Sequence, residues 1–176
     1  VLFYGSLMWY LKRSEDAWVY FQSGSDLGVI FGLGVITSGP IWASAEWNRP
    51  WDWGDMRLNS FALLTAVALF LLYSRQSQPD TQQNRDTLSA IGLFGFALVP
   101  ITAGATTWWE TTHPEVLVIE STESVGMSPD VRSFLLISFG LMCILFAGLL
   151  LLSNKRYRLA AEVSDRKNEL DQEAIS

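Results

Sequence analysis

The sequence is poor in several residue types on which functional sites are often built. Its single cysteine, Cys143, lies in an apolar stretch, and no C-x-x-C pair is present for redox chemistry. We expect Cys143 to be a small, buried packing residue. Neither a nucleotide-binding loop nor an internal repeat is visible. A net charge of −6 argues against a nucleic-acid partner.

Charged residues are also missing from four long apolar stretches, at 27–44, 58–74, 87–109 and 133–154. About 20 helical residues cross the roughly 30 Å hydrocarbon core, and about 17 suffice when flanking basic side chains reach the interface. The pattern therefore predicts an all-α fold, a polytopic bundle of transmembrane helices with four full spans. Residues 1–11 are apolar and form a partial span; because they begin without methionine, we expect the natural chain to start further upstream.

The distribution of lysine and arginine predicts the orientation in the membrane. Basic residues of short loops are retained on the cytoplasmic side. Nine of the twelve lie in 12–26, 75–86 and the tail after 154, and only Arg49, Arg57 and Arg132 fall on the other side. We therefore expect a multi-pass protein of the cytoplasmic membrane. Residues 1–154 would form its membrane domain, with extracytoplasmic loops at 45–57 and 107–132, and residues 155–176 a charged cytoplasmic tail.

The tryptophans are distributed unevenly between the two predicted faces. Only Trp9 and Trp18 lie toward the inside, whereas six lie outside: Trp42, Trp47, Trp51, Trp53, Trp108 and Trp109. An aromatic belt that anchors the protein at the interface is one explanation, but belts occupy both edges of a membrane. The asymmetry favours a platform for a flat, apolar ligand.

Haem would suit such a platform, because its faces are apolar, its propionates are anionic and its iron accepts an imidazole. The indoles would pack on the ring, and Arg49 and Arg57 could meet the propionates. His113, the only histidine, could bind the iron. Asp52 and Asp55 would repel propionates, so we expect them to orient neighbouring groups or to hold the loop through backbone N–H contacts.

Two motifs resemble those of the cytochrome c assembly family, the tryptophan-rich haem-handling proteins, and within it the CcmC type of system I. Residues 47–60, W-N-R-P-W-D-W-G-D-M-R-L-N-S, are similar to the family signature W-G-x-x-W-x-W-D-x-R-L-T-S. Residues 108–113, W-W-E-T-T-H, are similar to a W-W-N-T-L-H stretch that carries an external haem-ligand histidine. The chain departs from the signature at Asn48, where the family usually has glycine, and at Gly54, which is inserted before Asp55.

The resemblance covers nearly the whole chain and implies six spans in the complete protein. It implies a transient, b-type haem at the outer surface, with His113 and an upstream histidine as axial ligands. The other contact residues would be Trp47, Arg49, Trp51, Trp53, Asp55, Arg57, Trp108 and Trp109. It further implies haem transfer, lyase-like rather than conventionally enzymatic, to a CcmE-like haem chaperone, and an ABC-type complex with CcmA, CcmB and CcmD.

Three other functions are compatible with the sequence. A system II-type haem exporter and synthetase subunit would have a longer chain with further histidine-bearing spans. A membrane anchor that holds haem b or quinone would carry histidines inside its helices. A structural subunit without a cofactor would use its tryptophans only as interfacial anchors.

Overall fold

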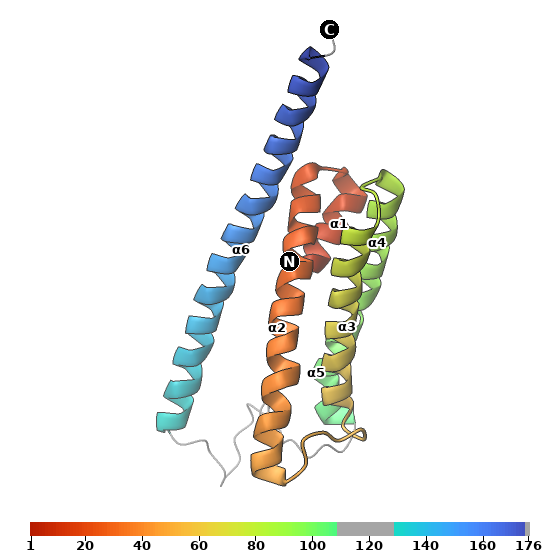
Figure 1. Cartoon of the computed structure of the whole chain (residues 1–176). Coiled ribbons are helices and arrows are strands. Elements are labelled where there is room, and N and C mark those ends of the chain that lie inside the picture. Colours follow the sequence, from red (N-terminus) through yellow and green to blue (C-terminus); the bar gives the residue numbers. More distant parts are fainter. Residues whose placement is uncertain (109–128, 175–176) are drawn as a thin grey trace.

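The computed structural model describes residues 1–108 and 129–174, and this part of the chain is helical and contains no strand. Figure 1 shows an elongated bundle of helices with α6 along one side. The elements are α1 (Leu2–Lys12), α2 (Glu15–Trp47), α3 (Met56–Ser77), α4 (Gln82–Phe96), α5 (Leu98–Trp108) and α6 (Pro129–Glu173).

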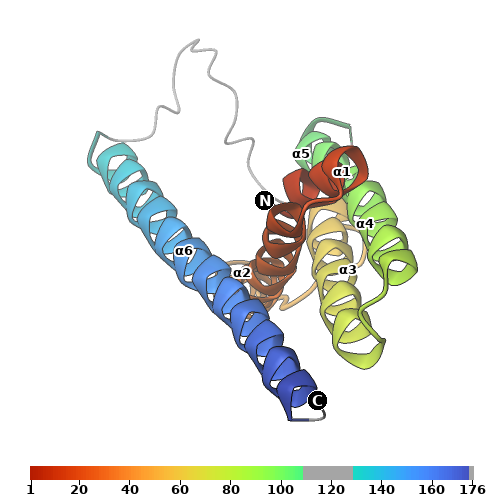
Figure 2. The same ribbon diagram turned by 90° about the horizontal axis from the view of Figure 1, so that it is seen from above.

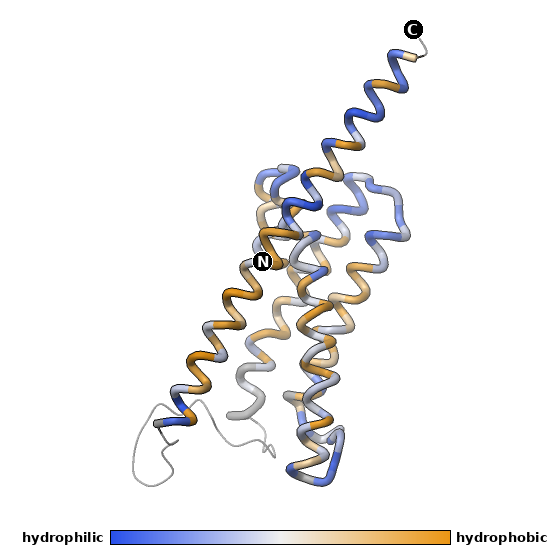
Figure 3. Tube along the Cα trace, turned by 60° about the vertical axis from the view of Figure 1, so that its left-hand side comes forward, coloured by the Kyte–Doolittle hydropathy of each residue, from blue (hydrophilic) through white to orange (hydrophobic). Residues whose placement is uncertain are grey.

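Three of these helices are long and apolar enough to cross a membrane, over Glu15–Glu46, Leu58–Ser77 and Asp130–Glu173. The predicted polytopic helical class is confirmed. Hydrophilic residues gather at the two ends of the bundle, and hydrophobic residues lie between them (Figure 3).

The predicted span 87–109 is not one continuous helix. It is divided into α4 and α5 at Ala97. Pro100 accounts for the break, because it has no N–H to donate to the carbonyl of Phe96 and its ring would clash with that carbonyl. Both pieces pack against α3, so together they still follow the length of the bundle (Figure 1).

The segment 12–26, predicted as a loop, is mostly helical. Arg13 ends α1 in the left-handed region at φ 50°, and α2 already begins at Glu15. The Ser14 side chain caps α2 by accepting a hydrogen bond from the backbone N–H of Ala17 at 3.3 Å. The acidic residues at the start of α2 also suit the positive end of the helix dipole. These capping interactions allow α2 to begin at Glu15, well before the apolar stretch that starts at residue 27.

The core lies where α1, α2, α3 and α4 meet, toward one end of the bundle. Trp9, Trp18, Phe21, Leu71 and Leu88 form a buried cluster, and the Trp18 ring stacks on Phe21 with centroids 4.6 Å apart. Trp9 and Trp18 are 4% and 3% exposed. Both tryptophans that the sequence predicts on the inner side are therefore core residues and not interfacial anchors.

Close helix packing depends on glycines of α2. A Cβ at Gly24 would lie 2.4 Å from the backbone nitrogen of Leu2 in α1, and one at Gly32 would lie 2.5 Å from Oγ1 of Thr65 in α3. Both distances are far too short for real carbon contacts. The glycine spacing therefore allows both neighbours to approach α2, as small-residue stripes do in membrane helices.

Helix α6 packs mainly against α2, and Figure 2 shows it diverging from the rest of the bundle. Most of its apolar side chains are exposed, as a lipid-facing helix requires. Cys143 is exposed as well, so the expectation of a buried cysteine was wrong. The helix continues without interruption into the charged residues 155–173 (Figure 3).

Candidate functional site

The tryptophan-rich segment connects α2 to α3 at one end of the bundle. Figure 1 shows that α5 ends and α6 begins at this same end. Of the predicted site residues, Arg49, Trp51, Trp53 and Asp55 lie between the two helices. The backbones of Trp47, Arg57 and Trp108 are placed at helix ends, but their side chains lie outside the described part of the structure, as do Trp109 and His113 altogether.

Backbone geometry explains why α2 ends where it does. Asn48 is the C-cap residue in the left-handed region, with φ 55°. Asparagine tolerates this conformation better than most residues, which explains how Asn48 can stand where the resembled signature has glycine. Pro50 follows two residues later and cannot continue the helix. The tryptophans at 51 and 53 are therefore carried by a turn and not by a helix.

Asp52 shapes that turn. Its Oδ1 accepts a hydrogen bond from the backbone N–H of Gly54 at 2.8 Å, and its carbonyl accepts one from the N–H of Asp55 at 3.1 Å. This is the Asx-turn geometry that aspartate favours. A Cβ at Gly54 would lie 3.2 Å from the Asp52 carboxylate. The inserted glycine is thus accommodated within the turn.

Asp55 caps the next helix. It is only 2% exposed, and its Oδ1 accepts a hydrogen bond from the backbone N–H of Leu58 at 3.2 Å. Its carbonyl also accepts from the N–H of Asn59 at 3.2 Å. The expectation that Asp52 and Asp55 hold the loop through backbone N–H groups is confirmed for both. Asp55 is therefore placed to position the loop at the start of α3.

Asn59, in the first turn of α3, makes a further contact with the loop. Its side-chain amide donates to the carbonyl of Trp53 at 2.8 Å. No role for Asn59 follows from the motifs alone, because its partner is a backbone carbonyl six residues earlier, whose position depends on the conformation of the turn. With Asp55, it fixes the backbone that carries the outermost indole.

The two indoles of the turn differ in their surroundings. The rings of Trp51 and Trp53 lie 5.8 Å apart between centroids and are inclined by 60°. Trp53 is 83% exposed, whereas Trp51 is partly buried and its Nε1 finds no acceptor among the described residues. Trp42, at the end of α2, is 52% exposed. The turn therefore presents the exposed indole of Trp53, with the buried N–H donor of Trp51 beside it.

This surface fits a flat, apolar ligand with acceptor groups at its edge. The indole faces offer apolar area, and the Nε1 of Trp51 offers a donor that lacks an acceptor among the placed side chains. Within the described residues no group of three or more His, Cys, Asp or Glu side chains could hold a metal ion. His113, the only histidine in the sequence, lies outside those residues.

Sequence comparisons are consistent with the motif resemblance. A family model described as "Heme exporter protein C" (CcmC) matches residues 1–171. The heme exporter protein C of Bradyrhizobium diazoefficiens is 27% identical over 75% of this chain and 47% of its own length. That of Haemophilus influenzae is 23% identical over 92% of this chain and 63% of its own length.

A plant relative is similar over a comparable region. The putative cytochrome c biosynthesis ccmC-like mitochondrial protein of Arabidopsis thaliana is 27% identical over 82% of this chain and 56% of its own length. The chain thus spans about half the length of the curated relatives that it matches. No solved structure is significantly similar.

Proposed function

The chain belongs to the Heme exporter protein C (CcmC) family, and on that premise we propose that it binds haem transiently at its tryptophan-rich end and presents it for cytochrome c maturation. The haem is cargo here, and we propose that it is b-type and held without a covalent bond. The observation that carries this proposal is the exposed Trp53 indole beside the partly buried Trp51, on a turn fixed by two carboxylates and an amide.

An open surface suits a protein that must release its cargo. A closed pocket buries most of a ligand's surface and holds it firmly. Trp53, exposed by 83%, would cover part of one porphyrin face and leave an edge accessible. We propose that a CcmE-like haem chaperone takes the haem at this edge. The ABC-type subunits CcmA, CcmB and CcmD are the proposed partners in the membrane.

His113 is the proposed axial ligand of the iron. It is the only histidine in the chain, and it follows α5, which ends at the same end of the bundle as the tryptophan-rich turn. Arg49 and Arg57 are proposed to pair with the propionates, since guanidinium groups match carboxylates in a bidentate geometry. Trp47, Trp108 and Trp109 would add apolar area around the ring.

The proposed orientation places this end outside the cytoplasmic membrane and the tail of α6 inside. The basic residues support it, because most of those in the described structure lie toward the other end. Arg13, Arg75, Arg85, Arg156 and Arg158 all form ion pairs there, with Asp86, Asp26, Asp80, Glu15 and Asp16 as their partners. Retention of basic loops on the cytoplasmic side gives the sidedness.

Replacement of His113 tests the proposal. We expect the purified full-length protein to carry haem with a spectrum typical of two imidazole ligands, and His113→Gly to lose that spectrum and the loading of the chaperone. Exogenous imidazole should restore part of both, because it can fill the space of the missing side chain. Unaltered loading by His113→Gly, in protein that inserts normally, would remove His113 from the proposed role.

Replacement of Trp53 tests the aromatic surface separately. Because this side chain is 83% exposed, Trp53→Ala should leave the fold intact while haem retention falls. Tyr73→Ala is the matched control. Tyr73 is also an exposed aromatic residue, at 72%, but it lies near the other end of α3, away from the turn. Equal haem retention in both variants would assign Trp53 to interfacial anchoring instead.

A further inference from the structure

Helix α6 continues beyond the rest of the bundle, on the side opposite the tryptophan-rich turn (Figure 1). Among the described residues, Arg158 makes the last ion pair between this helix and the bundle, with Asp16 of α2 at 2.8 Å. Residues 159–173, which we call the α6 extension, remain helical, and every one of them is exposed. An isolated helix of about 15 residues is only marginally stable in water. The α6 extension therefore offers a helical surface on which a partner could pack.

The apolar residues of the α6 extension follow the heptad spacing of a coiled coil. Its large apolar side chains are Leu159, Val163 and Leu170, and all of them are exposed. With Val163 at position a of the heptad, Leu170 is at the next a and Leu159 is at d. Residues at a and d form the stripe along which two helices of a coiled coil pack together. The α6 extension therefore carries such a stripe.

Opposite charges flank the stripe at the two positions that decide how coiled-coil helices pair. Val163 and Leu170 border an open surface groove, together with Arg166, Glu162 and Lys167. Glu162 is at position g and Lys167 at the following e. In a parallel pair of helices, g of one helix faces the following e of the other. Glu162 of one copy would therefore meet Lys167 of a second copy, and two-fold symmetry forms this contact twice.

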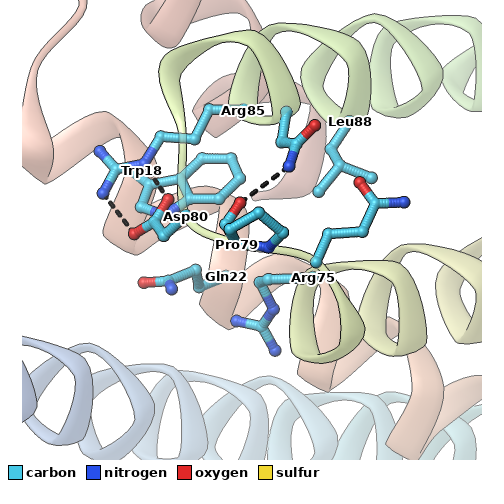
Figure 4. A pocket seen from close by; sticks show the side chains of 9 residues that line it. Trp18, Gln22, Arg75, Pro79, Asp80, Arg85 and Leu88 are labelled. Atoms are coloured by element: carbon cyan, nitrogen blue, oxygen red, sulfur yellow. Dashed lines mark hydrogen bonds and ion pairs between the residues drawn. The ribbon is translucent and has the colours of Figure 1, made fainter.

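Glu162 and Lys167 differ in their pairing from the charged residues at the nearby end of the bundle. There, Arg85 contacts Asp80 through Nε and Oδ1 at 2.5 Å (Figure 4), and it also pairs with Glu15 at 2.7 Å. In the described part of the chain, neither Glu162 nor Lys167 has an ion-pair partner. Both charges are therefore left for a contact between molecules.

The membrane gives two copies the orientation that this pairing needs. The apolar part of α6 is long enough to cross a bilayer, and copies of one chain insert with the same topology. Their α6 extensions therefore leave the membrane on the same side and run parallel. Confinement to a common membrane also raises the effective concentration of the two extensions, which helps a short stripe to associate.

The charge of the α6 extension argues against the bilayer surface as its partner. Helices that lie on a membrane usually have a polar face rich in lysine and arginine. Residues 159–173 contain five acidic and only two basic residues. Of the acidic residues, Asp165 and Asp171 are at positions c and b, on the side away from the stripe. A second helix suits this surface better than anionic headgroups do.

We propose that the α6 extension pairs with the same segment of a second copy as a parallel, two-stranded coiled coil. Arg166 falls at the d position between Val163 and Leu170. A polar residue at a core position lowers the stability of a coiled coil but fixes its register. Arg166 has Glu169 as a partner at 3.4 Å in its own helix. This inference is independent of haem binding at the other end.

Disulfide cross-linking of the full-length protein in membranes tests the contact. Cys143→Ser removes the natural thiol, and Val163→Cys or Asn168→Cys is then added. Both positions are exposed, but Val163 lies on the stripe and Asn168, at position f, lies opposite it. Mild oxidation should give several-fold more dimer with Val163→Cys on non-reducing gels. Equal yields from the two variants, or no dimer with Val163→Cys, would overturn the proposal.

Charge exchange tests the proposed partners. Glu162→Lys and Lys167→Glu each place like charges at both contacts of the dimer. Each should weaken self-association about tenfold, measured by energy transfer between labelled copies in liposomes, because two exposed ion pairs become repulsive. A mixture of the two variants should recover the association, since every lysine then faces a glutamate of the other copy. Both positions are exposed, so the melting temperatures should stay unchanged. Unchanged association in the single variants, or no recovery in the mixture, would contradict the pairing.

Discussion

Asn59 on α3 donates its side-chain amide to the carbonyl of Trp53, with Nδ2 and O 2.8 Å apart. The contact joins the first turn of a membrane helix to the residue that carries the most exposed indole of the tryptophan-rich turn. The ring itself is free to meet a ligand, while its backbone is held. The contact therefore links the backbone beneath the exposed indole directly to α3.

Removal of this contact should loosen the turn without unfolding the protein. Asn59→Ala loses one side-chain to backbone hydrogen bond, worth about 1 kcal/mol. We expect faster hydrogen exchange at residues 51–55, measured by mass spectrometry, and weaker haem retention. Thr87→Ala loses a comparable bond, from Oγ1 to the carbonyl of Gln83 at 3.0 Å, and should leave the turn unchanged. Identical exchange in both variants would show that Asn59 does not fix the turn.

Substitutions of Asp55 separate its capping role from its charge. Asparagine caps helices about as well as aspartate, whereas alanine costs about 1 kcal/mol at this position. We therefore expect Asp55→Asn to keep both thermal stability and haem retention, and Asp55→Ala to lose part of both. If Asp55→Asn already lost haem while its melting temperature stayed the same, the negative charge would act on the ligand directly.

The glycines of α2 give a prediction about packing. A side chain at Gly24 would collide with the backbone of α1, so Gly24→Val should destabilise the protein by about 1–3 kcal/mol, the usual range for overpacking. Nothing lies within 4 Å of a Cβ at Gly34 on the same helix. Gly34→Val should therefore have little effect on the melting temperature in detergent. Similar losses for both variants would contradict the packing described.

The polar cluster of Asp26, Arg75 and Tyr157, at the end of the bundle opposite the tryptophan-rich turn, gives a prediction about α6. Tyr157 donates to Asp26 at 2.6 Å, and Arg75 donates to the Tyr157 oxygen at 2.8 Å, which ties α6 to α2 and α3. Arg75→Met removes the shorter ion pair of Asp26 and leaves its carboxylate with Tyr157 and the more exposed Arg156, so we expect a loss of about 1.5–3 kcal/mol, as for a hydrogen bond to a charged group. Arg75→Met combined with Asp26→Asn should recover much of this loss in thermal melts.

The exposed pair of Arg166 and Glu169 provides the control. Its atoms lie 3.4 Å apart on the outside of α6, where both side chains are largely solvated. Arg166→Ala should leave the melting temperature unchanged, because isolated surface ion pairs contribute little. A large loss in this variant, or none in Arg75→Met, would contradict the assignment of Arg75 as the anchor.

The sequence by itself determined the features that depend on neighbouring residues. Stretches without charged residues predicted the membrane helices, because the free-energy cost of placing a charge in hydrocarbon depends only on the segment that carries it. The role of Asp52 and Asp55 as backbone acceptors was predictable for the same reason, since turns and caps involve residues only two or three positions apart. The family resemblance likewise rested on two short motifs.

Only the tertiary structure decided which faces of the helices are covered. It placed Trp18 in the core and left Cys143 exposed, although both lie in helices with apolar neighbours. It also joined Asp26, Arg75 and Tyr157, which are up to 131 positions apart. Hydropathy shows that a residue can be buried, but the burial itself depends on which distant helix packs against it, and no local pattern carries that information.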